Sequence, residues 1–310
     1  MVVPTLDGGE RWLRCLQALA EQRPRPALVV IDSDSTDGTR EAAERAGARV
    51  LRIEKAEFDH GETRNRGAAA LPPCDALVFL VQDAVPLGSD CLATLARAAL
   101  APGVGAASAR QVAPAEAGFL TASTVSSSPF AETAPRRTGP YPRAELEGLQ
   151  AEDWRPLLLL DDVACAVRGP LFRRGGFRAT PHAEDALLAY DLLWAGWALA
   201  HEPEAVVEHG HRYDAASVQR RYFTDALFFR KAFGLRIRPD LLSVLKGVNA
   251  ELRRDREWLA LHPGAGGNGA LRDARELRWA QVLAQREGSR GPLGRLPEPR
   301  PLPSPADLAG

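Results

Sequence analysis

The sequence predicts an α/β fold in which a mostly parallel central sheet carries helices on both faces. In its first half, short apolar segments rich in β-branched residues alternate with amphipathic segments. Such runs are typical of strands buried on both faces, and their alternation with helices is typical of parallel sheets. At 310 residues the chain is long enough for one large domain, or for one domain with an extension.

Strands and helices are expected to alternate up to residue 99. Strands are predicted where apolar residues run together, at 2–5, 27–31, 48–53 and 76–81. Helices are predicted where apolar residues recur at helical spacing, at 10–21, 40–46, 63–70 and 89–99. Residues 117–148 are rich in Ser, Thr, Pro, Gly and Ala, which predicts a long loop or an insertion.

The rest of the chain is expected to complete this domain and then become helical. Ordered segments are predicted at 157–160 and 164–168, a helix at 184–195 that ends before Gly196, and short strands at 197–201 and 205–207 around Pro203. Three amphipathic helices are predicted at 217–233, 239–261 and 271–287. The composition from Pro292 onward predicts disorder. We therefore expect an α/β domain over 1–212, a helical extension over 213–287 and a Pro-rich tail over 288–310.

Composition excludes several classes of protein. The chain has 39 basic and 40 acidic residues, so it lacks the excess positive charge of nucleic-acid-binding proteins. Its four cysteines are scattered, which favours reduced thiols over a disulfide framework or a closed zinc site. No apolar run approaches the length of a membrane span, and the N-terminus lacks the pattern of a signal peptide. These features predict a cytoplasmic protein.

Acidic residues follow two of the predicted strands. Asp32 and Asp34 follow the strand at 27–31, and Asp83 follows the strand at 76–81. Ligands of open α/β sheets bind beyond the carboxyl ends of the strands, and parallel strands share that edge, so these side chains should lie near one another. Carboxylates suit Mg²⁺ or Mn²⁺ bound with substrate phosphates. The alternative is an acid-rich helix start, because Asp and Ser are favoured helix caps.

Other polar clusters are candidates for chemistry. Glu184 and Asp185 stand at the start of a predicted helix, where a carboxylate could act as general base. Adjacent residues on a helix point about 100° apart, so we expect one of the two, Asp185, to reach the reaction centre. The alternative is that these acids are placed only to interact favourably with the helix dipole.

His209-Gly210-His211 could supply one imidazole to a cation, or form a hydrogen-bonding pair. The polar segment 58–65, which includes His60, is expected to face the same crevice. Arg110-Gln111 could contact phosphate or sugar hydroxyls, or form a solvated surface pair.

Together these residues resemble a known family. The order and spacing of seven elements resemble family 2 glycosyltransferases, and FxHGxTRN, QDA and RQ resemble its rhamnosyltransferase-like branch. The resemblance covers residues 2–233. Its elements are Pro4-Thr5, Asp32 to Thr39, Phe58 to Asn65, Gln82-Asp83-Ala84, Arg110-Gln111, Glu184-Asp185 and His209-x-His211.

The resemblance implies a GT-A fold and an inverting, metal-dependent transfer of a sugar, such as rhamnose, from a dTDP- or UDP-linked donor. The acceptor would be a saccharide, a lipid-linked or a small-molecule hydroxyl in bacterial polysaccharide or glycoconjugate synthesis. Asp185, beside Glu184, would be the base. Mg²⁺ or Mn²⁺ would be held by Asp83 with His209 or His211. The nucleotide would contact Pro4, Thr5, Asp32, Asp34, Arg64 and Asp83, and the acceptor or sugar would contact Arg110, Gln111 and His60.

Some features leave alternatives open. Leu6-Asp7 replaces the family's usual Tyr-Asn, and Asp161-Asp162 replaces a frequent Ser-Asn pair. A sugar nucleotidyltransferase is an alternative, although it would need a basic Gly-rich phosphate loop near the first strand; a non-catalytic nucleotide-sugar-binding module is another. Aromatic and basic residues alternate in segments 220–223 and 228–231, which fits peripheral contact at the inner face of a membrane, or core and homodimer packing.

Overall fold

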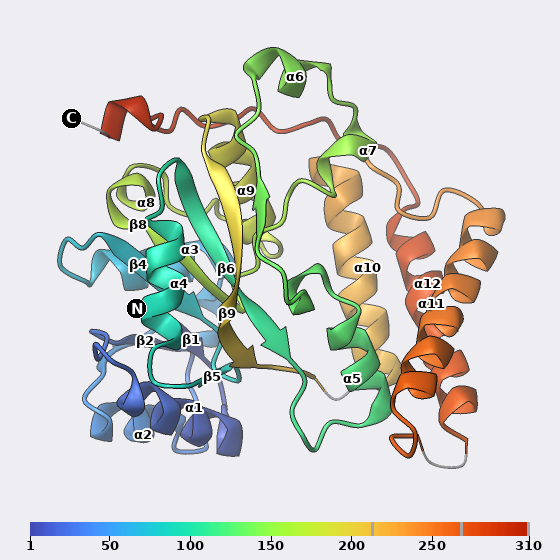
Figure 1. Ribbon diagram of the computed structural model, residues 1–310, viewed down its shortest axis with the longest axis horizontal. Helices are drawn as coiled ribbons and strands as arrows, with labels where there is room; N and C mark the ends of the chain where they lie inside the picture. The colour runs from blue at the N-terminus through green and yellow to red at the C-terminus, as the bar shows by residue number, and fades with distance from the viewer. Residues whose placement is uncertain (212–213, 267–268, 309–310) are drawn as a thin grey trace.

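The computed structural model describes residues 1–211, 214–266 and 269–308. It is built around one central sheet (Figure 1). The strands along this sheet are, in order, β3 (Arg49–Arg52), β2 (Val29–Asp32), β1 (Val2–Thr5), β4 (Ala76–Leu80), β8 (Ala164–Arg168), β6 (Val104–Val112), β9 (Ala198–Glu208) and β5 (Val85–Leu87), and β7 (Arg136–Thr138) pairs with β9.

The pairing confirms the α/β class and sets the edge at which polar residues gather. β3, β2, β1 and β4 are parallel neighbours, and β6 is parallel to β9. β8 runs antiparallel between β4 and β6, and β5 and β7 run antiparallel to β9. These reversed strands were not predicted, because strand direction depends on partners that are distant in sequence. Thr5 and Asp32 are register partners at the carboxyl ends of β1 and β2.

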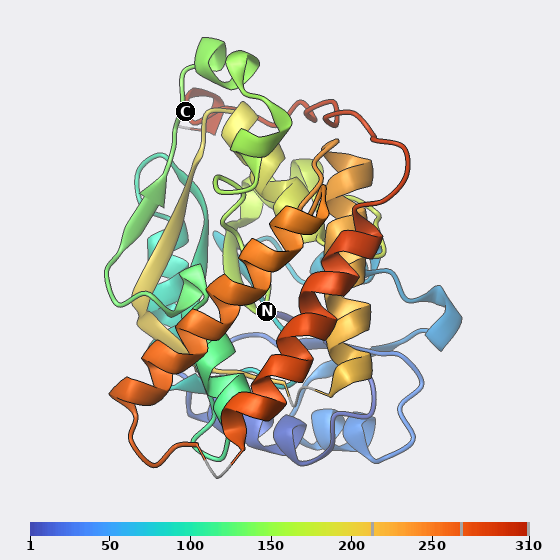
Figure 2. The same ribbon diagram turned by 90° about the vertical axis from the view of Figure 1, so that its right-hand side faces the viewer.

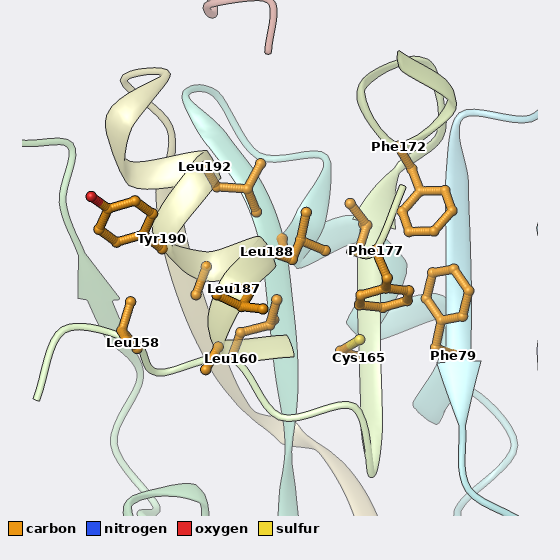
Figure 3. Close-up of a cluster of buried hydrophobic side chains, with 14 of the residues drawn as sticks. Phe79, Leu158, Leu160, Cys165, Phe172, Phe177, Leu187, Leu188, Tyr190 and Leu192 are labelled. Atoms are coloured by element: carbon orange, nitrogen blue, oxygen red, sulfur yellow. The ribbon is translucent and has the colours of Figure 1, made fainter. Parts of the chain in front are cut away.

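Helices cover both faces of the sheet, as predicted. α1 (Gly9–Glu21), α2 (Thr39–Arg45) and α4 (Cys91–Ala99) pack on one face, where every second strand residue, such as Val3 and Val30, joins one core. α3 (His60–Ala69), α8 (Gly169–Gly175) and α9 (Glu184–Trp194) contribute to the core on the other face. Figure 3 shows this second core, in which the ring of Phe79 lies 4.8 Å from that of Phe172 and α9 contributes a row of leucines.

The C-terminal helices α10 (Ala215–Ala232), α11 (Leu241–Leu261) and α12 (Ala270–Gly288) form a layer beside the sheet (Figure 2). α5 (Phe119–Ser126) packs against α11. A buried Arg278 donates two hydrogen bonds to Asp255, and Asp255 also accepts one from Ser123. This network joins α5, α11 and α12. Within the described ranges, no helix has both the length and the apolarity needed to cross a bilayer.

Segment 117–148, predicted as a long loop or an insertion, contains α5, a 3₁₀ turn at Pro129–Ala131, β7 and α6 (Arg143–Gly148), and α7 (Ala151–Trp154) follows. The loop alternative was wrong, because tertiary contacts order this segment: the ring of Phe119 lies 5.7 Å from that of Trp258 on α11. The two short strands predicted around Pro203 are one strand, β9, with an irregularity opposite Arg110. α3 begins earlier than predicted, at His60, because Asp59 caps it by accepting a hydrogen bond from the Glu62 amide.

The Pro-rich tail, predicted to be disordered, makes specific contacts as far as Leu308. Arg300 donates to the buried Asp191 of α9 (Nε to Oδ2, 2.8 Å) and to the carbonyls of Gly175 and Gly176. The Trp197 indole donates to the Pro303 carbonyl at 2.7 Å. Composition did not reveal this, because the partners lie about a hundred residues away in the sequence.

Candidate active site

The carboxyl ends of β1 and β2 form a braced turn. Thr5 Oγ1 donates to Asp32 Oδ2 and the Ser35 amide donates to Asp32 Oδ1, each at 3.1 Å. Asp32 is fully buried, so both its oxygens are engaged inside the protein. Asp34 follows in a left-handed conformation (φ 61°), exposed and 3.7 Å from Arg52. The structure thus joins Thr5 and Asp32, with the partly buried Pro4 before them and Asp34 beyond them on the surface.

The end of β4 is tied to the end of β1 by Gln82. Its side chain accepts from the Leu6 amide and donates to the Leu6 carbonyl, both at 2.9 Å. Asp83, the next residue, lies between two histidines, with Oδ1 3.8 Å from His209 Nε2 and Oδ2 3.7 Å from His211 Nδ1. The potential ligand atoms of these three side chains lie within 4.8 Å of one another. The structure therefore brings together the residues expected to hold a cation.

A hydrogen-bond chain fixes the orientation of His209. Gln111 Nε2 donates to Asp161 Oδ2 at 2.9 Å, which turns Gln111 Oε1 toward His209 Nδ1 at 3.2 Å. Because a carbonyl oxygen only accepts, Nδ1 must carry the proton, and the lone pair of Nε2 faces Asp83. Burial lowers the pKa of His209 to about 4, against the opposing effect of Asp83. The imidazole is therefore neutral, which is the form that binds metals, and this donor set fits a divalent cation.

Glu184 and Asp185, at the start of α9, have different surroundings. Ala183 before them adopts a left-handed conformation (φ 57°), a strained geometry that is common next to functional sites. Glu184 is buried and lies 2.8 Å from Arg64 Nη1, with His60 Nδ1 at 3.6 Å. Asp185 is partly exposed; Oδ1 accepts from the Ala186 amide at 2.7 Å. The divergence of neighbouring helix residues thus buries Glu184 against Arg64 and leaves Asp185 more exposed, although both residues line the same pocket.

Three carboxylates, Asp162, Glu184 and Asp185, interact with one guanidinium, and Asp161 adjoins this group. Arg64 is almost completely buried and contacts Glu184 and Asp162, the latter at 2.5 Å. Burial raises the pKa of Asp185 well above its usual range, and Asp162 and Asp161 raise it further. Burial and Asp162 likewise raise the pKa of Glu184, against the opposing effect of Arg64. A carboxylate with a raised pKa is better suited to accept a proton near neutral pH.

The FxHGxTRN segment fastens the chain that leads to α9. Asn65 donates to the Phe177 carbonyl at 3.0 Å and accepts from the Phe177 amide at 2.8 Å. Gly61 packs so closely that an added Cβ would lie 2.0 Å from the Arg178 carbonyl oxygen. The segment was expected to face the crevice, and His60 does line the pocket, but Asn65, Gly61 and the buried Arg64 hold neighbouring parts of the protein together.

A pocket of about 480 Å³ joins these groups. Its lining includes Asp185, Asp162, Gln111 and both histidines of the HxH motif. Arg110 is not part of this lining; it donates through Nε to the Pro203 carbonyl at 2.9 Å. The sequence did not predict the contribution of α10, which stands beside the sheet (Figure 1). The lining also includes His182 and, from α10, Arg221, Tyr222, Asp225 and Phe229. The aromatic and basic pattern of α10 was the available signal.

Comparisons with known proteins agree with one another. The family model described as glycosyl transferase family 2 matches residues 1–142. The O-antigen chain rhamnosyltransferase RfbN of Salmonella typhimurium is 29% identical over 232 residues, and WbaN of Salmonella anatum is 30% identical over 232 residues. Each alignment covers 74% of this chain and 71% of the relative.

A solved structure shares the fold. The mannosyltransferase PcManGT from Pyrobaculum calidifontis, in complex with GDP-Man and Mn²⁺, superposes with a TM-score of 0.53 at 20% identity. The match covers 92% of this chain and 84% of that protein. At this identity the likeness concerns the fold alone.

Proposed function

This chain belongs to glycosyltransferase family 2, and on that premise we propose that it transfers rhamnose from a dTDP- or UDP-linked donor to an acceptor hydroxyl, with inversion at the anomeric carbon and with a divalent cation. The GT-A fold implied by the sequence is confirmed. Family membership sets aside the nucleotidyltransferase and the non-catalytic module. Synthesis of a bacterial polysaccharide is supported by the two O-antigen relatives. Peripheral membrane contact and a homodimer stay predictions.

The observation that carries the proposal is the orientation of His209 toward Asp83. Asp83 and His209 would hold Mn²⁺ or Mg²⁺, with His211 as a further ligand. A bound cation would neutralise charge on the departing nucleoside diphosphate. The Gln111–Asp161 pair acts through His209 by fixing which nitrogen is protonated. The protein of similar fold that was solved with Mn²⁺ and GDP-Man supports the use of a divalent cation; the choice of ligands rests on the geometry of this chain.

Asp185 would act as the base. One of its oxygens takes the proton of the acceptor hydroxyl while the hydroxyl oxygen bonds to the anomeric carbon. The bond from that carbon to the donor phosphate breaks on the opposite face, and the nucleoside diphosphate leaves. The Ala186 amide orients the carboxylate, and the Glu184–Arg64 pair fixes the start of α9. Asp34, exposed beyond the end of β2, would contact the nucleoside next to Asp83, while Thr5 and the buried Asp32 would brace this edge of the sheet.

The test compares Asp185→Asn with Asp90→Asn, a change at an exposed carboxylate that makes no capping bond. Donor hydrolysis and transfer are measured over a panel of dTDP- and UDP-sugars with Mn²⁺ or Mg²⁺, and nucleotide binding is measured by thermal stabilisation. We expect Asp185→Asn to lose transfer but to keep nucleotide binding, and Asp90→Asn to keep both. Wild-type turnover in Asp185→Asn would remove the base assignment. Lack of stabilisation of the wild-type protein by any nucleoside diphosphate would overturn the donor assignment.

A further inference from the structure

A second pocket of about 810 Å³ adjoins the first. It lies between α10, α11 and α12 on one side and segments 124–129 and 152–159 on the other. The two pockets share Leu158, Tyr222 and Phe229 among their lining residues. A ligand in the second pocket could therefore extend into the first, where Asp185 lies.

This pocket is lined by six arginines, and we call it the arginine groove. They are Arg155, Arg221, Arg236, Arg238, Arg254 and Arg278. Its lining contains two carboxylates, Glu152 and Glu251. Two more acids pair with the groove from outside its lining, since Asp225 lies 3.7 Å from Arg155 and Asp255 lies 2.8 Å from Arg278. Cations still exceed anions here, although basic and acidic residues are balanced over the whole chain.

Arg238 is held in the groove by specific packing. Its Nε donates to Gln285 Oε1 at 3.1 Å, and its guanidinium lies against α11 at Gly247, where an added Cβ would be 2.7 Å away. Burial lowers the pKa of Arg238; Glu251 opposes this, and the nearby Arg155 and Arg254 lower it further. Holding one guanidinium near two others costs free energy, which a bound anion would offset.

We propose that the arginine groove binds a phosphate or diphosphate group of the acceptor, whose hydroxyl end then reaches Asp185 in the adjoining pocket. This rests on the proposed function, and it assigns the acceptor to the class of phosphate-bearing compounds. Guanidinium groups suit phosphate because their planar fork donates two parallel hydrogen bonds. The donor diphosphate is expected elsewhere, at the Asp83 edge of the sheet.

The experiment uses inorganic pyrophosphate as the probe, in metal-free buffer, so that binding does not depend on the cation site. Binding is measured by calorimetry for the full chain and for Arg155→Gln/Arg254→Gln, which removes two half-exposed groove cations. The matched control is Arg143→Gln/Arg253→Gln, in which the replaced side chains are more than 70% exposed and outside the groove lining. Arg253 and Arg254 are neighbours on α11, so the comparison separates position from net charge.

We expect one pyrophosphate per wild-type chain, an affinity at least about tenfold weaker in the groove variant, and no change in the control. Thermal stabilisation by a nucleoside diphosphate with Mn²⁺ should stay at the wild-type level in both variants. Equal pyrophosphate affinity in the groove variant and its control, or no binding to the wild type, would overturn the groove while leaving the donor assignment intact. Loss of nucleotide stabilisation in the wild type would instead overturn the proposed function.

A second arm identifies the source of the phosphate. Binding to phosphatidylglycerol vesicles is compared with binding to phosphatidylcholine vesicles for the same three proteins. Weaker binding of the groove variant alone to the anionic vesicles would support a lipid phosphate. If the groove variant bound the anionic vesicles as well as the wild type but had lost pyrophosphate binding, the result would support a soluble phosphorylated acceptor.

Discussion

Replacing Arg64 with Met tests the charge balance beneath the pocket. The Arg64 side chain is 3% exposed and contacts Glu184 at 2.8 Å and Asp162 at 2.5 Å. Met fills much of the same volume but leaves two carboxylates without their cation. Removing one partner of a buried ion pair typically costs about 3–5 kcal/mol. We expect a loss of this size in the free energy of unfolding at pH 8, a large share of the roughly 5–15 kcal/mol of a typical domain.

The matched control is Arg66→Met, on the same helix. Arg66 is 44% exposed and lies 3.6 Å from Glu57 and 3.9 Å from Glu62. Exposed pairs of this kind contribute about 0–1 kcal/mol. Urea denaturation of both variants, without metal or nucleotide, gives the comparison. If Arg64→Met lay within about 1 kcal/mol of Arg66→Met, the reasoning about the buried pair would be refuted.

Two further measurements keep this prediction testable if Arg64→Met folds poorly. Arg64→Met/Glu184→Gln should recover part of the loss, because the amide removes one of the unpaired charges. Loss of the guanidinium also raises the folded-state pKa of Glu184 further above its unfolded value, because Arg64 is the group that lowers it. A raised folded-state pKa gives stability that is present at low pH and lost as pH rises. Because the pKa of Glu184 is already raised to about 10 in the folded wild type, the deficit of Arg64→Met should grow as pH rises through about 10, and a constant deficit over that range would contradict this account.

Three other predictions follow from the structure. In the absence of a cation, the melting temperature of the wild type should fall as pH rises from about 5 to 8, because the pKa of Asp185 is raised in the folded state. Differential scanning fluorimetry should show a weaker dependence of the melting temperature on pH for Asp185→Asn. Arg300→Ala should lower the free energy of unfolding in urea denaturation by about 2–4 kcal/mol, because it weakens the pairing of the buried Asp191. The control, Arg295→Ala at an exposed position, should change this free energy by no more than about 0.5 kcal/mol. Equal losses in the two variants would mean that the tail is not docked. Mn²⁺ at a hundredfold its dissociation constant should raise the free energy of unfolding of the wild type in urea denaturation by about 2.7 kcal/mol. Asp83→Asn should lose this stabilisation by Mn²⁺. Stabilisation of the variant equal to that of the wild type would remove Asp83 from the cation site.

The parts of the site that could be predicted are those governed by local rules. Parallel strands share one carboxyl edge, so the ends of β1, β2 and β4 could be placed at one edge without knowing any contact, and Gln82 does tie the end of β4 to Leu6 after β1. Helix geometry predicted different surroundings for Asp185 and Glu184; both line the pocket, but Glu184 is buried against Arg64 whereas Asp185 is partly exposed. Their catalytic roles, like those of His209 and His211 as ligands, stay predictions.

The parts that could not be predicted depend on distant partners. The sequence shows that α10 is amphipathic, but it does not show whether Tyr222 faces a membrane, a second subunit or a pocket. Polar residues at 58–65 predicted a ligand-facing loop, yet Asn65 engages the Phe177 backbone and Arg64 is buried. Arg110 and Gln111 are adjacent in β6 and so point to opposite faces; Gln111 lines the pocket, and which of the two would do so depends on the placement of β6 in the sheet.

The docking of Arg300 against Asp191 bears on how the chain folds while it is being made. The two residues are 109 positions apart, and they meet on the helix whose first turn carries the proposed base. At roughly 5–20 residues per second, a ribosome needs on the order of 5–20 seconds to cover that interval. During this time Asp191 has Arg178 as a counter-charge but still lacks Arg300. The negative charge of Asp191, on the helix behind the active site, is therefore fully compensated only after translation has passed residue 300. The catalytic domain and the segment around Arg300 thus complete their folding together.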